Sequence, residues 1–261
     1  AVKSKNNRSQ CIFVGHSFGG LIMENAICKA LLGAIFDSEG QSVDSPTDLV
    51  VLINPACEAI GAKQFADILR RNKVTVRMGE SSTKNGIPFP LLISISSEGD
   101  WATKFAFPFG QFFVSITKSF RKYNPKPVGL PRQRWLSMNT AGHLLYFRNF
   151  EVEPKSNGAT SEDNLEFSFN NGQKKYQIVP KNNGQDALPF WIMRVPKEIV
   201  PNHSDIFTEA FENMLSSLLQ WTATSVEPTK LKCDRYEQPP DQGVATDYIN
   251  KIEHLMDSGT D

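Results

Sequence analysis

The chain has 261 residues, and its 28 lysines and arginines balance 28 aspartates and glutamates, so its formal net charge at pH 7 is zero. This balance gives no reason to expect binding to nucleic acid or to an anionic membrane. Hydrophobic residues make up 40% of the chain, which is enough for a buried core and argues against disorder. No uninterrupted apolar run approaches the roughly 20 residues that cross a bilayer, so we expect no membrane span.

The first hundred residues alternate between apolar strands and helices. The runs CIFVGH (11–16), DLVVLINPA (48–56) and FPLLISISS (89–97) are continuously apolar and predict buried strands. Helical spacing of apolar residues predicts helices over 19–36 and 57–72. Strands that are apolar on both faces and alternate with helices predict an α/β fold, with a mostly parallel sheet covered by helices on both faces.

The pattern is looser after Asp100. Residues 101–120 are rich in aromatic side chains and predict a partly helical stretch that Pro108 interrupts. The proline-rich residues 124–133 predict a loop. Residues 165–179 predict a β-hairpin with Asn171 and Gly172 at its turn.

The chain then returns to regular structure before a polar end. PFWIMRV (189–195) predicts another strand. Residues 205–221 predict a helix whose apolar stripe comprises Phe207, Phe211, Met214 and Leu218. Residues 223–261 form a polar C-terminal tail, apart from a weakly amphipathic stretch at 244–256.

Thiol content gives a weak indication of compartment. The chain has four cysteines: Cys11, Cys28, Cys57 and Cys233. They show neither a CxxC motif nor metal-ligand spacing, and three of the four lie in apolar stretches. Buried free thiols are therefore expected rather than a disulfide framework. Free thiols fit a reducing compartment, which favours the cytoplasm.

The sequence GHSFGG (15–20) fits the pattern G-x-S-x-G at Gly15, Ser17 and Gly19. It joins a predicted strand to a predicted helix without a gap. A serine on such a sharp turn presents its hydroxyl to substrate in a strained backbone conformation, and side chains two residues before and after it would collide. The N-terminus of the following helix points at the reacting centre, so the Phe18 backbone N–H can stabilise an oxyanion.

GHSFGG resembles the nucleophile elbow of lipases and esterases in the α/β-hydrolase superfamily. The resemblance covers residues 11 to about 221, at superfamily level. It implies the chain order serine, acid, histidine, with 11–16 as the fifth strand of the sheet, 48–56 as the sixth, 89–97 as the seventh and 189–195 as the eighth.

A serine nucleophile needs a base, and the base needs an orienting carboxylate. By the resemblance, His203 occupies the position of the base, in the loop between the last strand and the last helix. Asp100 occupies the position of the acid after the seventh strand, and it also suits the N-cap of a helix beginning at Trp101. Glu58, after the sixth strand, is the alternative acid, and His143 is the alternative base.

Two features depart from the superfamily pattern. The stretch between Asp100 and His203 is far longer than one helix crossover, so we expect a cap-like insertion at about 101–188 that contains the 165–179 hairpin. Its phenylalanines are expected either to line an acyl pocket or to pack in the core: Phe105, Phe107, Phe109, Phe112 and Phe113. The second departure is the absence of four strands before the elbow, from which we expect residues 1–222 to be the C-terminal portion of a longer hydrolase domain.

The sequence thus predicts a serine hydrolase that cleaves a carboxylic ester or related acyl bond through an acyl-Ser17 intermediate. The substrate would be a small or lipid-like acyl compound, and neither a metal nor an organic cofactor is implied. An acyltransferase or thioesterase would use the same residues. A non-catalytic binding module that keeps the fold is the remaining alternative.

Overall fold

The computed structural model describes residues 11–37, 43–44, 47–71, 76–77, 83–84, 87–88, 90–117, 130–155, 165–169, 172–181 and 189–223. The strands of its main sheet are, in chain order, β1 (Ile12–His16), β3 (Leu49–Ile53), β7 (Leu92–Ser97), β8 (Phe150–Pro154), β9 (Leu165–Phe169), β10 (Lys174–Pro180) and β11 (Phe190–Val195). The α-helices are α1 (Phe18–Asp37), α2 (Ala59–Arg71), α3 (Phe107–Thr117), α4 (Leu130–Met138) and α5 (Glu209–Ala223). A π-helical turn η1 (Ala102–Ala106) and a 3-10 turn η2 (Ala141–His143) complete the helical segments described.

Four strands of two residues form two small pairs outside the main sheet. In one pair β2 (Val43–Asp44) runs parallel to β4 (Val76–Arg77). In the other β5 (Thr83–Lys84) runs antiparallel to β6 (Ile87–Pro88).

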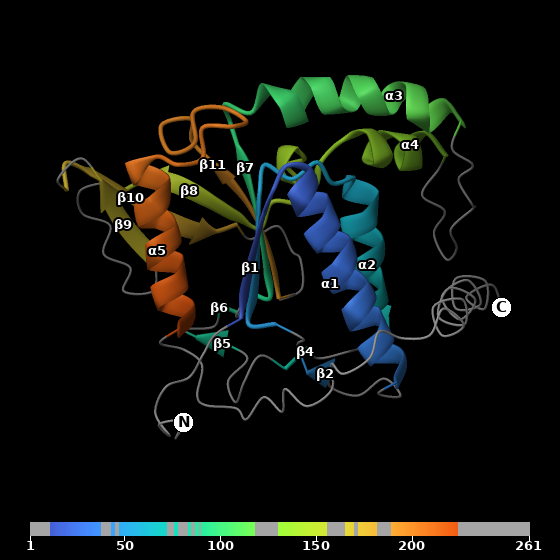
Figure 1. Ribbon diagram of the computed structural model, residues 1–261, viewed down its shortest axis with the longest axis horizontal. Coiled ribbons are helices and arrows are strands. Elements are labelled where there is room, and N and C mark those ends of the chain that lie inside the picture. The colour runs from blue at the N-terminus through green and yellow to red at the C-terminus, as the bar shows by residue number, and fades with distance from the viewer. Residues whose placement is uncertain are drawn as a thin grey trace, which may run out of the picture.

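The main sheet has the order β1-β3-β7-β11-β8-β10-β9 (Figure 1). The first four pairings, from β1 to β8, are parallel. The last two, which join β8 to β10 and β10 to β9, are antiparallel. The prediction of an α/β fold with a mostly parallel sheet is confirmed.

Helices cover both faces of this sheet, as predicted. Alternate residues of β3 point to opposite faces: Val50 and Leu52 pack with α1 and α2, whereas Val51 and Ile53 pack with α5. Figure 1 shows α1 and α2 on one side of the sheet and α5 on the other. All five residues of β3 and all six of β7 are buried, because these strands lie between covered faces.

Helix α5 begins later than the apolar spacing predicts. Thr208 caps it, since the Phe211 amide donates to the Thr208 hydroxyl at 3.1 Å, and the helix starts at Glu209. Phe207 therefore precedes the helix and is 85% exposed, so its assignment to the apolar stripe is wrong. Phe211 and the other two stripe residues, Met214 and Leu218, are buried as expected.

The 165–179 hairpin forms as predicted, with Gly172 at its turn in the left-handed conformation (φ 80°); Asn171 lies outside the described residues. Its expected place in a cap is wrong, because β9 and β10 extend the main sheet beyond β8. The sequence did not predict β8, which supplies the edge that the hairpin needs.

The helices of the insertion, α3 and α4, are separate from the hairpin, which belongs to the sheet. In Figure 1, α3 and α4 lie across the end of the sheet at which α1 begins. Residues 130–133, predicted as loop, belong to α4. Pro108 does not interrupt the helical run, which continues from η1 into α3; it lies just after the change from π-helical to α-helical backbone at Phe107.

Strand β1 stands at one end of the sheet order and is the most open of the parallel strands described. Its Phe13 and Val14 are 44% and 50% exposed. Within the described part of the chain, one helical window, Phe18–Ile35 of α1, is long and apolar enough to cross a membrane by length and composition alone. Because Leu31 and Ile35 of this helix are buried against the sheet, its apolar content also serves packing, and the expected lack of a membrane span stays a prediction.

The described cysteines are free thiols, of which Cys57 is buried, Cys28 partly buried and Cys11 exposed. The expectation of burial is therefore wrong for Cys11. Cys233 and the tail from residue 224 lie outside the described residues.

Candidate active site

Ser17 stands on a sharp turn between β1 and α1. Its φ of 54° is in the left-handed region, which costs free energy in a residue with a side chain. The turn is fixed to the neighbouring strand, because the Ser17 amide donates to the Ile53 carbonyl at 3.0 Å and the Ser17 carbonyl accepts from the Ala56 amide at 3.1 Å. The predicted strained turn is thus present. Phe18 is the first residue of α1, and its amide belongs to the helix-start N–H groups that have no partner within the helix.

The glycines around Ser17 differ in whether their surroundings leave room for a side chain. A Cβ on Gly15 would lie 2.8 Å from the Gly19 carbonyl oxygen, so the turn excludes a side chain there. A Cβ on Gly19 would meet nothing within 4 Å, so the expected collision at this position is wrong. The second tight glycine is Gly20, where a Cβ would come within 2.9 Å of the Pro55 side chain.

The structure brings Ser17, His203 and Asp100 together. His203 Nε2 lies 2.9 Å from Ser17 Oγ, and His203 Nδ1 lies 3.0 Å from Asp100 Oδ1. A carboxylate only accepts hydrogen bonds, so Nδ1 carries the proton and Nε2 accepts from the serine hydroxyl. Ser17 and His203 are partly exposed, whereas Asp100 is completely buried. The arrangement therefore has a hydroxyl and a base open to solvent, above an inaccessible carboxylate.

Asp100 also begins the helical segment that follows it. Its Oδ1 accepts from the Thr103 amide at 3.1 Å, as an N-cap side chain does, and its Oδ2 accepts from the Thr103 hydroxyl. The capping role expected for Asp100 is therefore present together with its contact to His203. The helical run that it caps begins at Trp101 and continues into the π-helical turn η1, a conformation often found at functional sites.

The loop that carries His203 is fastened to the ends of three strands. The His203 carbonyl accepts from His16 Nε2 at 2.7 Å and from Asn54 Nδ2 at 3.2 Å. Asn54 is buried in the left-handed region (φ 43°), and its Oδ1 accepts from the Ser97 amide at 2.9 Å. The sequence analysis places Asn54 only within the predicted strand at 48–56. The sequence feature that could have indicated the structural role of Asn54 is its position: an asparagine, a residue tolerant of positive φ, directly after a buried strand.

Glycine at position 99 allows the acid and base loops to meet. A Cβ on Gly99 would lie 1.9 Å from the Pro201 carbonyl oxygen. Next to it, the Ser97 hydroxyl donates to the Val200 carbonyl. The end of β7 and the His203 loop are thus packed backbone to backbone, which fixes Asp100 relative to His203.

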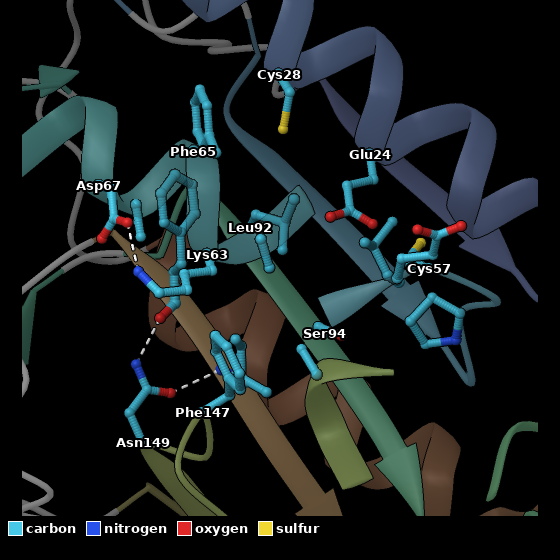
Figure 2. A pocket seen from close by; sticks show the side chains of 18 of the residues that line it. Glu24, Cys28, Cys57, Lys63, Phe65, Asp67, Leu92, Ser94, Phe147 and Asn149 are labelled. Atoms are coloured by element: carbon cyan, nitrogen blue, oxygen red, sulfur yellow. Dashed lines mark hydrogen bonds and ion pairs between the residues drawn. The ribbon is translucent and has the colours of Figure 1, made fainter. Parts of the chain in front are cut away.

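Glu58, the alternative acid, does not take the place of Asp100. It lines a cavity of about 80 Å³ between α1, α2 and the sheet, whereas His203 Nδ1 lies 3.0 Å from Asp100 Oδ1. The same cavity is lined by Glu24 and Cys57 (Figure 2). Burial raises the pKa of Glu24, and burial together with Glu24 raises the pKa of the Cys57 thiol. These effects favour the protonated thiol of Cys57 over the thiolate.

His143, the alternative base, does not contact Ser17. It lies in η2, and its Nε2 is 2.8 Å from the Thr103 hydroxyl oxygen. The structure thus places the two candidate histidines on different groups: His203 on Ser17 and Asp100, and His143 on Thr103.

The phenylalanines of the insertion are mostly at the surface. Four of the five are about half exposed or more: Phe105, Phe109, Phe112 and Phe113. Core packing is therefore the wrong interpretation for these four, and their lining of an acyl pocket stays a prediction.

No protein-family model, no curated protein and no solved structure matches this chain.

Proposed function

We propose that this protein is a serine-dependent hydrolase of carboxylic esters or related acyl compounds, and that its sheet is that of an α/β-hydrolase. The observation that carries the proposal is the position of His203, whose two ring nitrogens lie 2.9 Å from Ser17 Oγ and 3.0 Å from Asp100 Oδ1. The order β1-β3-β7-β11 supports the fold, because it matches the fifth to eighth strands that the resemblance implies.

The reaction follows from these contacts. Ser17 Oγ attacks the acyl carbon while its proton passes to His203 Nε2, and the buried Asp100 carboxylate stabilises the imidazolium that forms. The Phe18 amide donates to the oxyanion at the start of α1. The leaving alcohol takes the proton from Nε2, and the acyl-serine is then hydrolysed by water that Nε2 activates in the same way.

Covalent labelling tests the proposal directly. The protein is treated with a fluorophosphonate probe, and the adduct is located by mass spectrometry. We expect the adduct on Ser17, its loss in Ser17→Ala, and its retention in Ser204→Ala, which removes an exposed hydroxyl beside the base. An adduct at another residue, or no adduct on protein that turns over a p-nitrophenyl ester, contradicts the assignment.

Two alternatives give different results in the same experiments. A non-catalytic binding module would be neither labelled nor active on a panel of esters. An acyltransferase would be labelled on Ser17 but would convert esters faster when an alcohol acceptor is added.

A further inference from the structure

The Asp100 carboxylate has a second side that faces away from His203. Oδ1 accepts from His203 Nδ1 at 3.0 Å and from the Thr103 amide at 3.1 Å. Oδ2 accepts from the Thr103 hydroxyl. Since Asp100 is completely buried, these protein donors take the place of water around its negative charge.

The contacts of Thr103 fix the direction of every proton in this group. The Thr103 hydroxyl has a single proton, which it gives to Asp100 because a carboxylate only accepts. The hydroxyl oxygen must then accept from His143 Nε2, 2.8 Å away. His143 therefore carries its proton on Nε2 and donates to Thr103, which donates to Asp100. His203 Nδ1 donates to the same carboxylate from the other side.

The backbone around His143 holds this chain in place. Gly142 lies against β7, where a Cβ would come within 2.0 Å of Ser96 Oγ. The His143 amide donates to the Thr140 carbonyl at 3.2 Å, which closes the η2 turn. β7 also leads directly into Asp100, so the acid and the second histidine are positioned by the same strand.

We propose that Thr103 and His143 are positioning residues of the active site: Thr103 holds the Asp100 carboxylate towards His203, and His143 holds the Thr103 hydroxyl towards Asp100. Neither residue transfers a proton to the substrate. The inference rests on the proposed function for its catalytic consequence, whereas the hydrogen-bond arrangement itself is testable without any activity.

The electrostatics around His143 agree with this role. Burial, which has the largest effect, and the nearby Arg194, Lys104 and Arg148 together lower its pKa to about 4, against the opposing effect of Asp100. At neutral pH the ring is therefore uncharged and has one proton to donate. If the His143 ring were protonated at neutral pH, its positive charge would compete with His203 as the counterion of Asp100.

Paired variants of Thr103 test the catalytic part. Thr103→Val keeps the shape but removes the hydroxyl, and we expect kcat to fall about 10–100-fold with little change in KM. Thr103→Ser keeps the hydroxyl and should retain most of the activity. If valine and serine lower kcat equally, or if valine changes only KM or the melting temperature, Thr103 does not position Asp100.

Paired variants of His143 extend the test. Glutamine can donate from its Nε2 to Thr103, so His143→Gln should stay active. Methionine fills similar space without a donor, and His143→Met should lose activity to about the same extent as Thr103→Val. The reverse ranking, or equal loss in both variants, contradicts the role of the Nε2 proton.

Nitrogen-15 NMR of histidine-labelled protein at pH 7 separates this inference from the proposed function. The His143 resonances, assigned by their loss in His143→Gln, should show a protonated Nε2 and an unprotonated Nδ1. The His203 Nδ1 proton should shift in Thr103→Val but not in Thr103→Ser. A proton on His143 Nδ1, or a His203 signal insensitive to Thr103, overturns the inference even if Ser17 is labelled. Absence of labelling with the expected NMR pattern refutes the hydrolase and leaves the hydrogen-bond arrangement intact.

Discussion

Replacing Asp100 by asparagine is the sharpest perturbation of the proposed mechanism. The carboxylate accepts three hydrogen bonds, from His203 Nδ1, the Thr103 amide and the Thr103 hydroxyl. An amide of the same shape offers one oxygen and one NH₂ group. In the place of Oδ1 the NH₂ group would face both His203 Nδ1 and the Thr103 amide, and in the place of Oδ2 it would face the Thr103 hydroxyl. If the NH₂ group faces His203, the imidazole is driven to the tautomer with its proton on Nε2, which cannot accept from Ser17.

The magnitude follows from the distance between the charges. An imidazolium on His203 would have its Nδ1 at 3.0 Å from Asp100 Oδ1. For unit charges about 3–4 Å apart and an effective dielectric constant of about 20, Coulomb's law gives about 4–6 kcal/mol. Loss of this stabilisation in the transition state corresponds to a decrease in kcat of about 10³–10⁴-fold.

Initial rates on a p-nitrophenyl ester at neutral pH measure the effect, with melting temperature as the check on folding. Asp67→Asn is the matched control, because it makes the same chemical change in the Lys63 ion pair on α2, away from the site. Glu58→Gln tests the alternative acid. A folded Asp100→Asn protein of normal activity, or a Glu58→Gln protein that is crippled instead, would refute the assignment of Asp100.

Turnover measurements on the two histidine variants should separate their roles: His203→Ala should lower kcat about 10⁴-fold or more, because members of a triad fail as a unit, whereas His143→Ala should cost far less. The reverse ranking would make His143 the base. Gly15→Ala should destabilise the protein by about 1–3 kcal/mol in a denaturant titration and abolish turnover, because its Cβ meets backbone at 2.8 Å. Gly19→Ala, with open space for the same Cβ, should be tolerated, and equal damage from both changes would contradict the elbow geometry. The His143 ring, with its pKa lowered to about 4, binds a proton in the unfolded chain before it does so in the folded protein. The free energy of unfolding should therefore fall by about 3 kcal/mol as the pH drops from 6.5 to 4, and comparison with His143→Gln, which lacks this contribution, measures the difference.

The elements around Ser17 were predictable because their signals are local. β1, β3 and β7 are short runs apolar on both faces, and a glycine-flanked serine joins the first of them to a helix. The approximate positions of Asp100 and His203 followed from the resemblance, because each comes just after a strand. Where a residue reaches the site because it closely follows a strand, a local sequence pattern is enough to predict its place.

The remaining features depend on contacts between distant segments. β8 alternates Phe150 and Val152 with glutamates, a pattern too short to distinguish an inner strand from a loop. The hairpin was predictable but its partner strand was not, since the sequence specifies a turn and not the edge that the hairpin joins. The contact of Thr103 with His143 spans 40 residues, and no spacing rule connects them.

The same distances along the chain have a consequence for how the site comes into being. His203 lies 186 residues after Ser17 and 103 after Asp100, and the three meet only when β1, β3, β7 and β11 have paired in register. Parallel pairing of segments so far apart costs the entropy of closing large loops before stabilising contacts form. Folding should therefore be slow compared with that of helical proteins of similar stability. A partly folded chain that lacks β11 would hold Ser17 on its turn without a base. Reactivity towards a fluorophosphonate would then report the folding of the whole sheet rather than of the elbow alone.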